Sequence, residues 1–182
     1  MSSTMLKAII NIPSDKHSVG NLSNWNKSVV NGGARVKEDV IENFSIVELS
    51  YATDGVRECS YLSADANKGY LIASVEDYME EFGEGISNFY NAKGEMARIV
   101  VLEPLITRFD TSNFVLDDKG ASAKKVENNM KVHWDAKTKK FLVSNGATDN
   151  AGYANAGNKF VVVEADSVSI DGQKTIRLEC VK

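Results

Sequence analysis

The chain has 182 residues, of which 43% are hydrophobic and 25% charged, and its 21 basic and 25 acidic residues give a net charge of −4. This length and composition predict one soluble domain, or one domain plus an arm, that buries a core without metals or disulfides, and they exclude a disordered or collagen-like chain. Mild acidity argues against direct binding of nucleic acid, and no apolar run is long enough to span a membrane.

The residue pattern of positions 1–34 predicts an extended arm that contains an early strand. Residues 6–12 are apolar enough for a strand, whereas residues 17–34 are polar and rich in Asn and Gly, with one aromatic residue, Trp25. The N-terminus lacks the basic start and the small-residue cleavage site of a signal peptide. We therefore divide the chain into an arm with a first strand (residues 1–34) and a single β-rich core domain (residues 35–182).

Alternating or continuous apolar residues predict strands through most of the core domain. These strands cover residues 44–49, 69–74, 97–103, 130–134, 141–144, 159–165 and 175–180. Asp171-Gly172 predicts a tight hairpin between the last two strands, and the polar residues 135–139 predict another turn. Many short strands with turn signals indicate a mainly β fold, with a β-barrel or sandwich-like core, rather than alternating strands and helices.

One short helix is predicted over residues 74–82. Ser74 precedes Asp77 by three positions, as in a capping box, and Gly83 follows as a stop. The apolar residues between them recur at steps of three and four, which places them on one face.

Catalytic and zinc-binding patterns are weak. Cys59 and Cys180 are either two buried thiols or one disulfide, and the thiols are favoured because a chain this long needs no covalent staple. The two histidines, His17 and His133, are too scattered to complete a zinc site with them. In the strand around His133, either this histidine or Trp134 faces the core, which favours a structural histidine over a general base.

Oxygen-bearing side chains give equally little support for chemistry. Acid pairs such as Glu80 with Glu84 are typical of a solvated face, so an enzyme with a carboxylate-based site is the weakest interpretation. Asp149, Asn150 and Asn155 are potential calcium ligands, but their spacing is not that of an EF-hand. We predict no catalytic residue, no cofactor and no bound metal.

Charge is distributed unevenly along the chain. Residues 119–140 carry many lysines, whereas residues 76–84 are strongly acidic. Patches of opposite sign can align a protein against a charged partner or against copies of itself, although ordinary interspersed surface lysines are an equally good explanation.

Several segments, taken in order, resemble a known class of phage protein. They are GYLIASVEDYMEEF, SNFYNAKGEMARIVVLE, TRFDTSNF, KKFLVS and NKFVVVEADSVSIDGQKTIRLEC, with the motif G-E-x-A-R-I at residues 94–99 and F-D-T-S-N-F at residues 109–114. This order resembles the capsid decoration (head cement) proteins of tailed bacteriophages. The resemblance covers residues 69–180, with a weaker echo at 39–50. Residues 117–129 and 145–158 are long for that family, and the N-terminal arm has no counterpart.

The resemblance implies a non-enzymatic virion structural protein. Such a protein is assembled in the host cytoplasm, lies on the outer capsid surface and stabilises the shell by bridging capsid subunits. Its implied partners are the major capsid protein and copies of itself, without direct contact to nucleic acid or membrane. We expect the polar stretches 1–34 and 145–158 to become ordered on such a partner. The candidate contact residues are Trp25, Lys27, Arg35, Lys124, Lys125 and Tyr153.

The main alternative is another phage module of β architecture, such as a tail or baseplate component or a carbohydrate-binding domain. A carbohydrate binder should expose several aromatic side chains on one surface. The candidates are Trp25, Tyr61, Tyr90 and Tyr153, and nothing in the sequence groups them.

Overall fold

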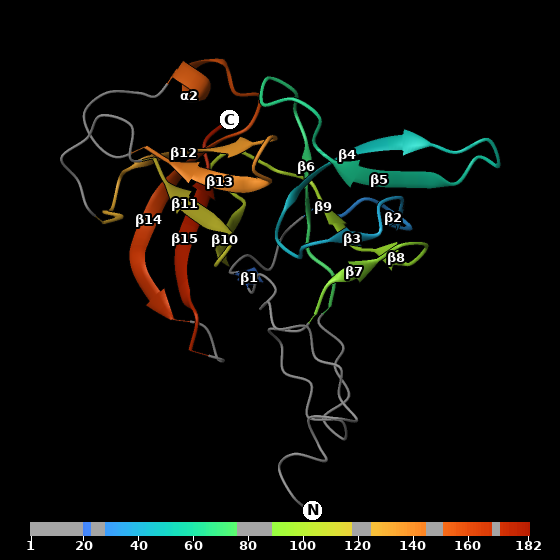
Figure 1. Ribbon diagram of the computed structural model, residues 1–182, viewed down its shortest axis with the longest axis horizontal. Coiled ribbons are helices and arrows are strands. Elements are labelled where there is room, and N and C mark those ends of the chain that lie inside the picture. Colours follow the sequence, from blue (N-terminus) through green and yellow to red (C-terminus); the bar gives the residue numbers. More distant parts are fainter. Residues whose placement is uncertain (1–19, 23–27, 76–88, 118–124, 145–150, 169–171) are drawn as a thin grey trace, which may run out of the picture.

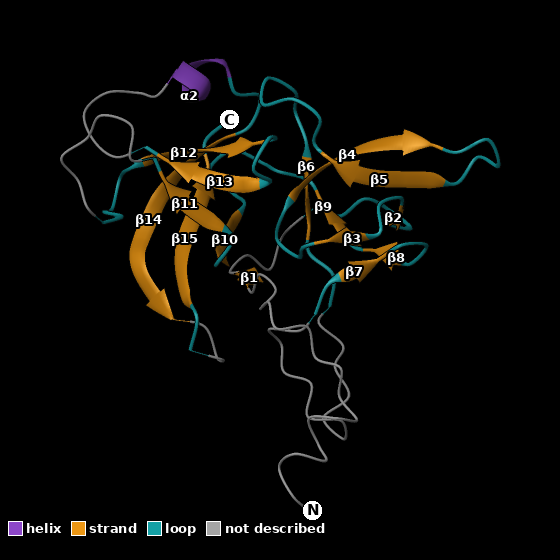
Figure 2. Ribbon diagram, viewed as in Figure 1, coloured by secondary structure: helices purple, strands orange, loops and turns teal. Residues whose placement is uncertain are grey.

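The computed structural model describes residues 20–22, 28–75, 89–117, 125–144, 151–168 and 172–182. Strands dominate this part of the chain (Figure 2) and form sheets of seven, six and two strands. The predicted mainly β fold is confirmed. The sheets pack in a sandwich-like manner, and the described strands form no closed barrel.

The six-stranded sheet comes from the N-terminal half, on the right of Figure 1. Its strands, in the order β8-β2-β5-β4-β6-β9, are Met96–Ala97, Ala34–Val36, Arg57–Tyr61, Ile46–Tyr51, Tyr70–Ile72 and Ile99–Val100. The two end strands are separated in sequence by Arg98 alone, so the sheet curls until its ends approach each other. Beside it lies the two-stranded sheet of β3 (Val40–Ile41) and β7 (Asn91–Ala92), and the β4–β5 hairpin projects from the body (Figure 1).

The seven-stranded sheet comes mainly from the C-terminal half. In the order β1-β10-β15-β14-β12-β13-β11 its strands are Gly20–Leu22, Arg108–Thr111, Lys174–Cys180, Lys159–Val168, Lys131–Asp135, Lys140–Val143 and Phe114–Leu116. Neighbours are antiparallel except β11 and β13, which are parallel. Within the described ranges the helix is α2 (Ala151–Asn155), and no helix there could cross a membrane.

Aromatic side chains fill the core of the seven-stranded sheet. The ring centroid of Phe109 lies 5.6 Å from that of Phe141 and 5.9 Å from that of Phe160. The Trp134 ring meets Phe141 edge-on at 5.0 Å. Such tilted and edge-on pairs add to the roughly 1.5–3 kcal/mol that burying each large apolar side chain contributes. Alternation along the strands therefore points one face of this sheet into a shared aromatic core.

The loop between β5 and β6 joins the two halves of the molecule. The Asp65 carbonyl oxygen accepts a hydrogen bond from the Gly157 N–H at 2.8 Å, and the Asp65 carboxylate accepts one from the Ala136 N–H at 2.8 Å. The Gly69 N–H donates to the Asn158 side-chain oxygen at 2.6 Å. These bonds connect residues 65–69 with the segment after α2 and with the β12–β13 turn.

The predicted strands of the core domain are confirmed within a few residues, except that the strand predicted at 97–103 is interrupted at Arg98 and ends at Val100. The antiparallel pairing of β12 with β13 and of β14 with β15 is confirmed, whereas Asp171 of the predicted tight turn lies outside the described residues. The early strand at residues 6–12 and residues 76–82 of the predicted helix lie outside the described residues. The prediction that residues 145–158 form a loop too polar for the core is wrong for part of the described residues 151–158. They begin with α2, and Ala156 is 1% and Asn158 5% exposed. The polar Asn158 is buried because its side chain satisfies the Gly69 N–H.

The described parts of residues 1–34 lie against the sheets. Residues 20–22 form β1, which pairs antiparallel with β10. The Val30 N–H donates to the Ile99 carbonyl oxygen at 2.9 Å, and Ala34 is fully buried. The boundary at residue 34 falls within β2, so the chain enters the six-stranded sheet there.

Four buried residues answer questions that the sequence left open. Cys59 and Cys180 are free thiols in different sheets, and burial raises the pKa of each to about 11. Of the two neighbours, Trp134 is the one that faces the core, as the alternation requires, yet His133 is also only 1% exposed. Trp134 faces the aromatic core, whereas the His133 ring lies against Tyr153 of α2, with centroids 6.5 Å apart.

Candidate functional site

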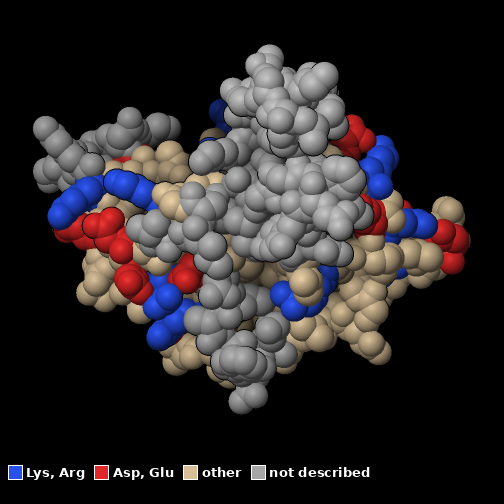
Figure 3. Space-filling model, turned by 90° about the horizontal axis from the view of Figure 1, so that it is seen from below, with Lys and Arg blue, Asp and Glu red and all other residues tan. Residues whose placement is uncertain are grey.

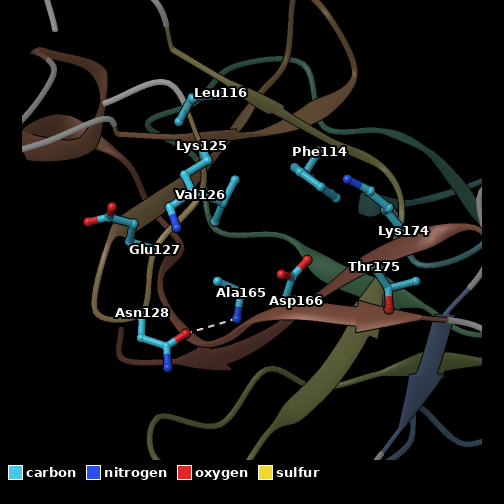
Figure 4. A pocket seen from close by; sticks show the side chains of 10 residues that line it. All are labelled: Phe114, Leu116, Lys125, Val126, Glu127, Asn128, Ala165, Asp166, Lys174 and Thr175. Atoms are coloured by element: carbon cyan, nitrogen blue, oxygen red, sulfur yellow. Dashed lines mark hydrogen bonds between the residues drawn. The ribbon is translucent and has the colours of Figure 1, made fainter. Parts of the chain in front are cut away.

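A groove of about 670 Å³ opens between β11 and the far ends of β14 and β15. Its lining residues (Figure 4) are Phe114, Leu116, Lys125, Val126, Glu127, Asn128, Ala165, Asp166, Lys174 and Thr175. β11 and residues 125–126 form one wall, and β14 and β15 form the other. The Asn128 side-chain oxygen links the walls by accepting the Ala165 N–H at 2.9 Å.

The strand that borders this groove has one open edge. The Phe141 N–H donates to the Asn113 carbonyl oxygen at 3.0 Å, and the Asp117 N–H donates to the Val143 carbonyl oxygen at 2.8 Å. In a parallel pair, alternate residues direct their backbone groups to the neighbouring strand. Residues 113, 115 and 117 direct theirs to β13, so Leu116 directs its N–H and carbonyl away from it. Among the described strands, β11 pairs with β13 alone.

The opposite wall is also incompletely paired. The last partners of β10 and β15 are Thr111 and Ile176, so Lys174 and Thr175 extend beyond β10. β10 ends there because the chain bends at Ser112. The next residue, Asn113, is fixed by its buried amide, which donates to the Ser45 hydroxyl at 3.2 Å and to the Lys139 carbonyl at 3.1 Å. The groove therefore lies beside two incompletely paired edges, the outer edge of β11 and the part of β15 that extends past β10.

The lining chemistry suits an extended peptide. Phe114, Leu116 and Val126 offer apolar contacts, and the rim carries charges of both signs, with Lys125 and Lys174 against Glu127 and Asp166. A strand added to an open edge gains main-chain hydrogen bonds, and its alternate side chains reach the lining.

The structure does not gather the six sequence-predicted contact residues at one place. Trp25, Lys27 and Lys124 lie outside the described residues. Lys125 lines the groove, Arg35 lies in β2 and Tyr153 lies in α2. The expectation from the sequence therefore overlaps the groove at a single described residue.

Arg35 is held near the tip of the projecting β4–β5 hairpin, between the turn residue Asp54 and Glu58 at the start of β5. Its guanidinium donates to Glu58 at 2.9 Å and to Asp54 at 3.2 Å. The hydrogen bond to Glu58, and to a smaller extent the one to Asp54, raises the pKa of Arg35. The pKa of Asp54 is lowered mainly by the hydrogen bond from the Val56 N–H and less by the one from Arg35. These hydrogen bonds indicate that Arg35 stabilises the β4–β5 hairpin.

Tyr153 lies between lysines on the outer side of β12 and β14. The ammonium groups of Lys159 and Lys131 are 5.1 Å and 5.4 Å from the centroid of its ring. Lys159 also donates to the Ala154 carbonyl at 2.9 Å, which fastens α2 to β14. The Tyr153 ring thereby covers His133, and these contacts account for the position of Tyr153 as structural.

His133 should make the stability of the protein depend on pH. Burial lowers its pKa below the ordinary 6.5, against the opposing effect of Asp65, Asp135 and Asp117. Below pH 6.5 the unfolded chain therefore takes up the proton first, and stability present above that pH is lost as pH falls toward the folded-state pKa. We expect the wild-type unfolding free energy to drop by about 1 kcal/mol between pH 7 and pH 5.5, and H133L to lack that slope. Urea unfolding at both pH values measures it, and equal slopes would contradict it.

Ion pairs cross the outer face of the seven-stranded sheet. Arg177 of β15 donates to both carboxylate oxygens of Asp110, at 2.8 Å and 3.1 Å, and to Glu164 at 2.7 Å. Asp110 raises the pKa of Arg177 by accepting these bonds. Charged side chains of both signs lie side by side on the described surface (Figure 3). These ion pairs of Arg177 hold β10, β15 and β14 together, so we assign them a structural role.

The G-E-x-A-R-I motif is structural as well. Gly94 occupies the left-handed region with φ 85°, and the Glu95 carboxylate accepts the Ala92 N–H at 2.9 Å to close the turn. Arg98 donates a side-chain hydrogen bond to the Ala73 carbonyl and its N–H to the Ser74 hydroxyl. The motif thus brings together the two ends of the six-stranded sheet.

Two further sequence expectations bear on ligands. Tyr61 was expected to be exposed, but it is 9% exposed, because its ring stacks on Trp134 with centroids 6.3 Å apart. Burial raises its pKa to about 12. Asp149 and Asn150 lie outside the described residues, and within those residues no three His, Cys, Asp or Glu side chains group as a metal site.

Comparison with known proteins places the chain among phage sequences. The model of a family described as "YonC prophage protein" matches residues 13–181. The SPbeta prophage-derived uncharacterized protein YonC of Bacillus subtilis (strain 168) is 38% identical over 184 residues, covering 100% of this chain and 99% of that protein. No solved structure matches significantly.

Proposed function

We infer the function of this chain from one premise: it belongs to the YonC prophage protein family. It is therefore a phage-derived protein. We propose that it is a virion structural protein without enzymatic activity, which binds the outer capsid surface and stabilises the shell by bridging capsid subunits. Its partner is the major capsid protein, and its location is the finished particle.

The observation that carries this proposal is the groove beside β11. A groove with an open strand edge, an apolar lining and charges of both signs accepts an extended segment of another protein. The sequence of this chain resembles head decoration proteins, which bind capsid proteins. We therefore take the extended segment in the groove to belong to the major capsid protein. A protein bound across subunits stabilises the assembled shell because it binds that state in preference to separate subunits.

The first measurement asks where the protein lies. We expect induction of the lysogen that encodes it, followed by density purification of particles, to recover the untagged protein in a fixed ratio to the major capsid protein. Immunogold with an antibody against the protein should label heads. Its absence from particles would overturn the virion role, and label confined to tails would favour a tail or baseplate component.

The second measurement tests the groove itself. L116P removes the outward N–H of β11 at a position where an edge strand tolerates proline, so it should weaken binding to shells that lack the protein by at least tenfold, or about 1.4 kcal/mol. L116A keeps that N–H and is the matched control for the lost side chain. Sedimentation of purified protein with shells gives the bound fraction, and circular dichroism verifies folding. Equal binding by L116P and L116A would rule out strand addition at β11.

A further inference from the structure

An exposed leucine is held in an unfavourable backbone conformation on the turn between β9 and β10. Leu105 has φ 63°, in the left-handed region that side chains with a β-carbon avoid, and it is 75% exposed. A strained residue persists where the surrounding structure enforces it, and such residues concentrate at functional positions. An exposed leucine gains nothing from this conformation within the described part of the chain.

Hydrogen bonds hold the turn around Leu105 rigid. The Leu105 N–H donates to the Cys180 carbonyl at 2.7 Å, and the Thr107 N–H donates to the Glu103 carbonyl at 2.9 Å. The Glu103 N–H in turn donates to the Thr107 hydroxyl at 2.9 Å. The turn therefore presents the leucine in a fixed position, so that little conformational entropy is lost when it binds a partner.

A small cavity lies directly beside this leucine. It has a volume of about 200 Å³, and its apolar walls include Tyr70, Val101, Leu102 and Pro104. This space corresponds to roughly six waters and admits one aliphatic side chain. Two lysines, Lys68 and Lys182, also line it.

We propose that a second copy of this chain binds here, with Leu105 of each copy inserted into the cavity of the other. A two-fold interface requires a protrusion and its receptor on one face, and Pro104, which lines the cavity, is the neighbour of Leu105. The charges agree with this pairing, because Glu103 flanks the protrusion whereas Lys68 and Lys182 flank the cavity. Within the described residues, no ion pair uses any of these three side chains.

This interface is small, so the dimer of the free protein is weak and forms toward millimolar concentration. Attachment of neighbouring copies to one lattice would raise their effective concentration and favour the same contact. The inference does not depend on the capsid proposal, because the free protein in solution tests it.

The test is sedimentation velocity of the full chain from micromolar to millimolar concentration. We expect wild type to shift toward a dimer and L105G to raise the dimer dissociation constant at least tenfold. Because glycine accepts positive φ, L105G should also raise the midpoint of thermal unfolding, an effect that loss of a structural leucine would not produce. Y51A removes another exposed large side chain, 71% exposed at the end of β4, and should leave dimerisation unchanged.

Charge reversal tests the geometry of the pairing. E103K should weaken the dimer, and the triple variant E103K/K68E/K182E should restore it toward wild type. A wild-type protein that stays monomeric at millimolar concentration, or an L105G protein that dimerises as wild type does, would overturn the proposal. A triple variant that fails to recover beyond E103K would overturn the two-fold pairing.

Discussion

Replacing Gly157 with alanine is expected to lower the unfolding free energy by about 3 kcal/mol. A β-carbon on Gly157 would lie 2.0 Å from the Asn67 carbonyl oxygen and 2.3 Å from its carbonyl carbon. Both atoms belong to the backbone of the loop that joins the two halves of the molecule, so they cannot rotate away. The Gly157 N–H donates to Asp65 in the same loop, and separation of the two backbones would break that bond as well.

Urea unfolding of wild type and G157A measures this loss. G55A is the matched control, because Gly55 has φ 80° and a β-carbon at that position would meet no other atom within 4 Å. It should cost about 1 kcal/mol, from backbone strain alone. Equal losses in the two variants would mean that the loop moves aside at little cost, and would contradict close packing of the halves at Gly157.

Replacing Arg177 with methionine is expected to lower the unfolding free energy by about 2 kcal/mol. Asp110 is 8% exposed and loses both of its hydrogen bonds from the guanidinium, which leaves a nearly buried carboxylate without its cation. The cost falls below that of a fully buried pair because the Arg177 side chain is 32% exposed, so water screens the charges.

Two controls isolate the role of charge at this position. K93M breaks the pair of Lys93 with Asp39, whose side chains are 65% and 89% exposed, and should change stability by less than about 0.5 kcal/mol. D110N in the R177M background removes the uncompensated carboxylate and should recover part of the loss. If R177M/D110N is no more stable than R177M, the loss arises from packing of the arginine stem and not from the charge.

The candidate site was only partly predictable from the sequence. The lysine-rich stretch drew attention to Lys125, which does line the groove. Residues 114–116 carried a signal of strand character, Phe-Val-Leu, but nothing in them distinguishes an edge strand from a central one. The edge depends on which strand pairs with β11, and that partner, β13, lies more than twenty residues further along the chain.

Local sequence alone determined many strands of the core domain, but it did not identify β5, β10 or β11. Alternation of apolar and polar residues is set by neighbours two positions apart, and the turn at 135–139 follows from short-range backbone preferences. Burial of Tyr61, Asn158 and both His133 and Trp134 was decided by tertiary structure. Tyr61 is covered by Trp134, and the Asn158 side chain accepts the Gly69 N–H. In both contacts the two residues are far apart in the sequence, so no local pattern reveals them. The groove arises in the same way, because an open strand edge exists only after the other strands have paired. The conformation of Leu105 depends on tertiary structure as well, since its N–H donates to the distant Cys180 carbonyl.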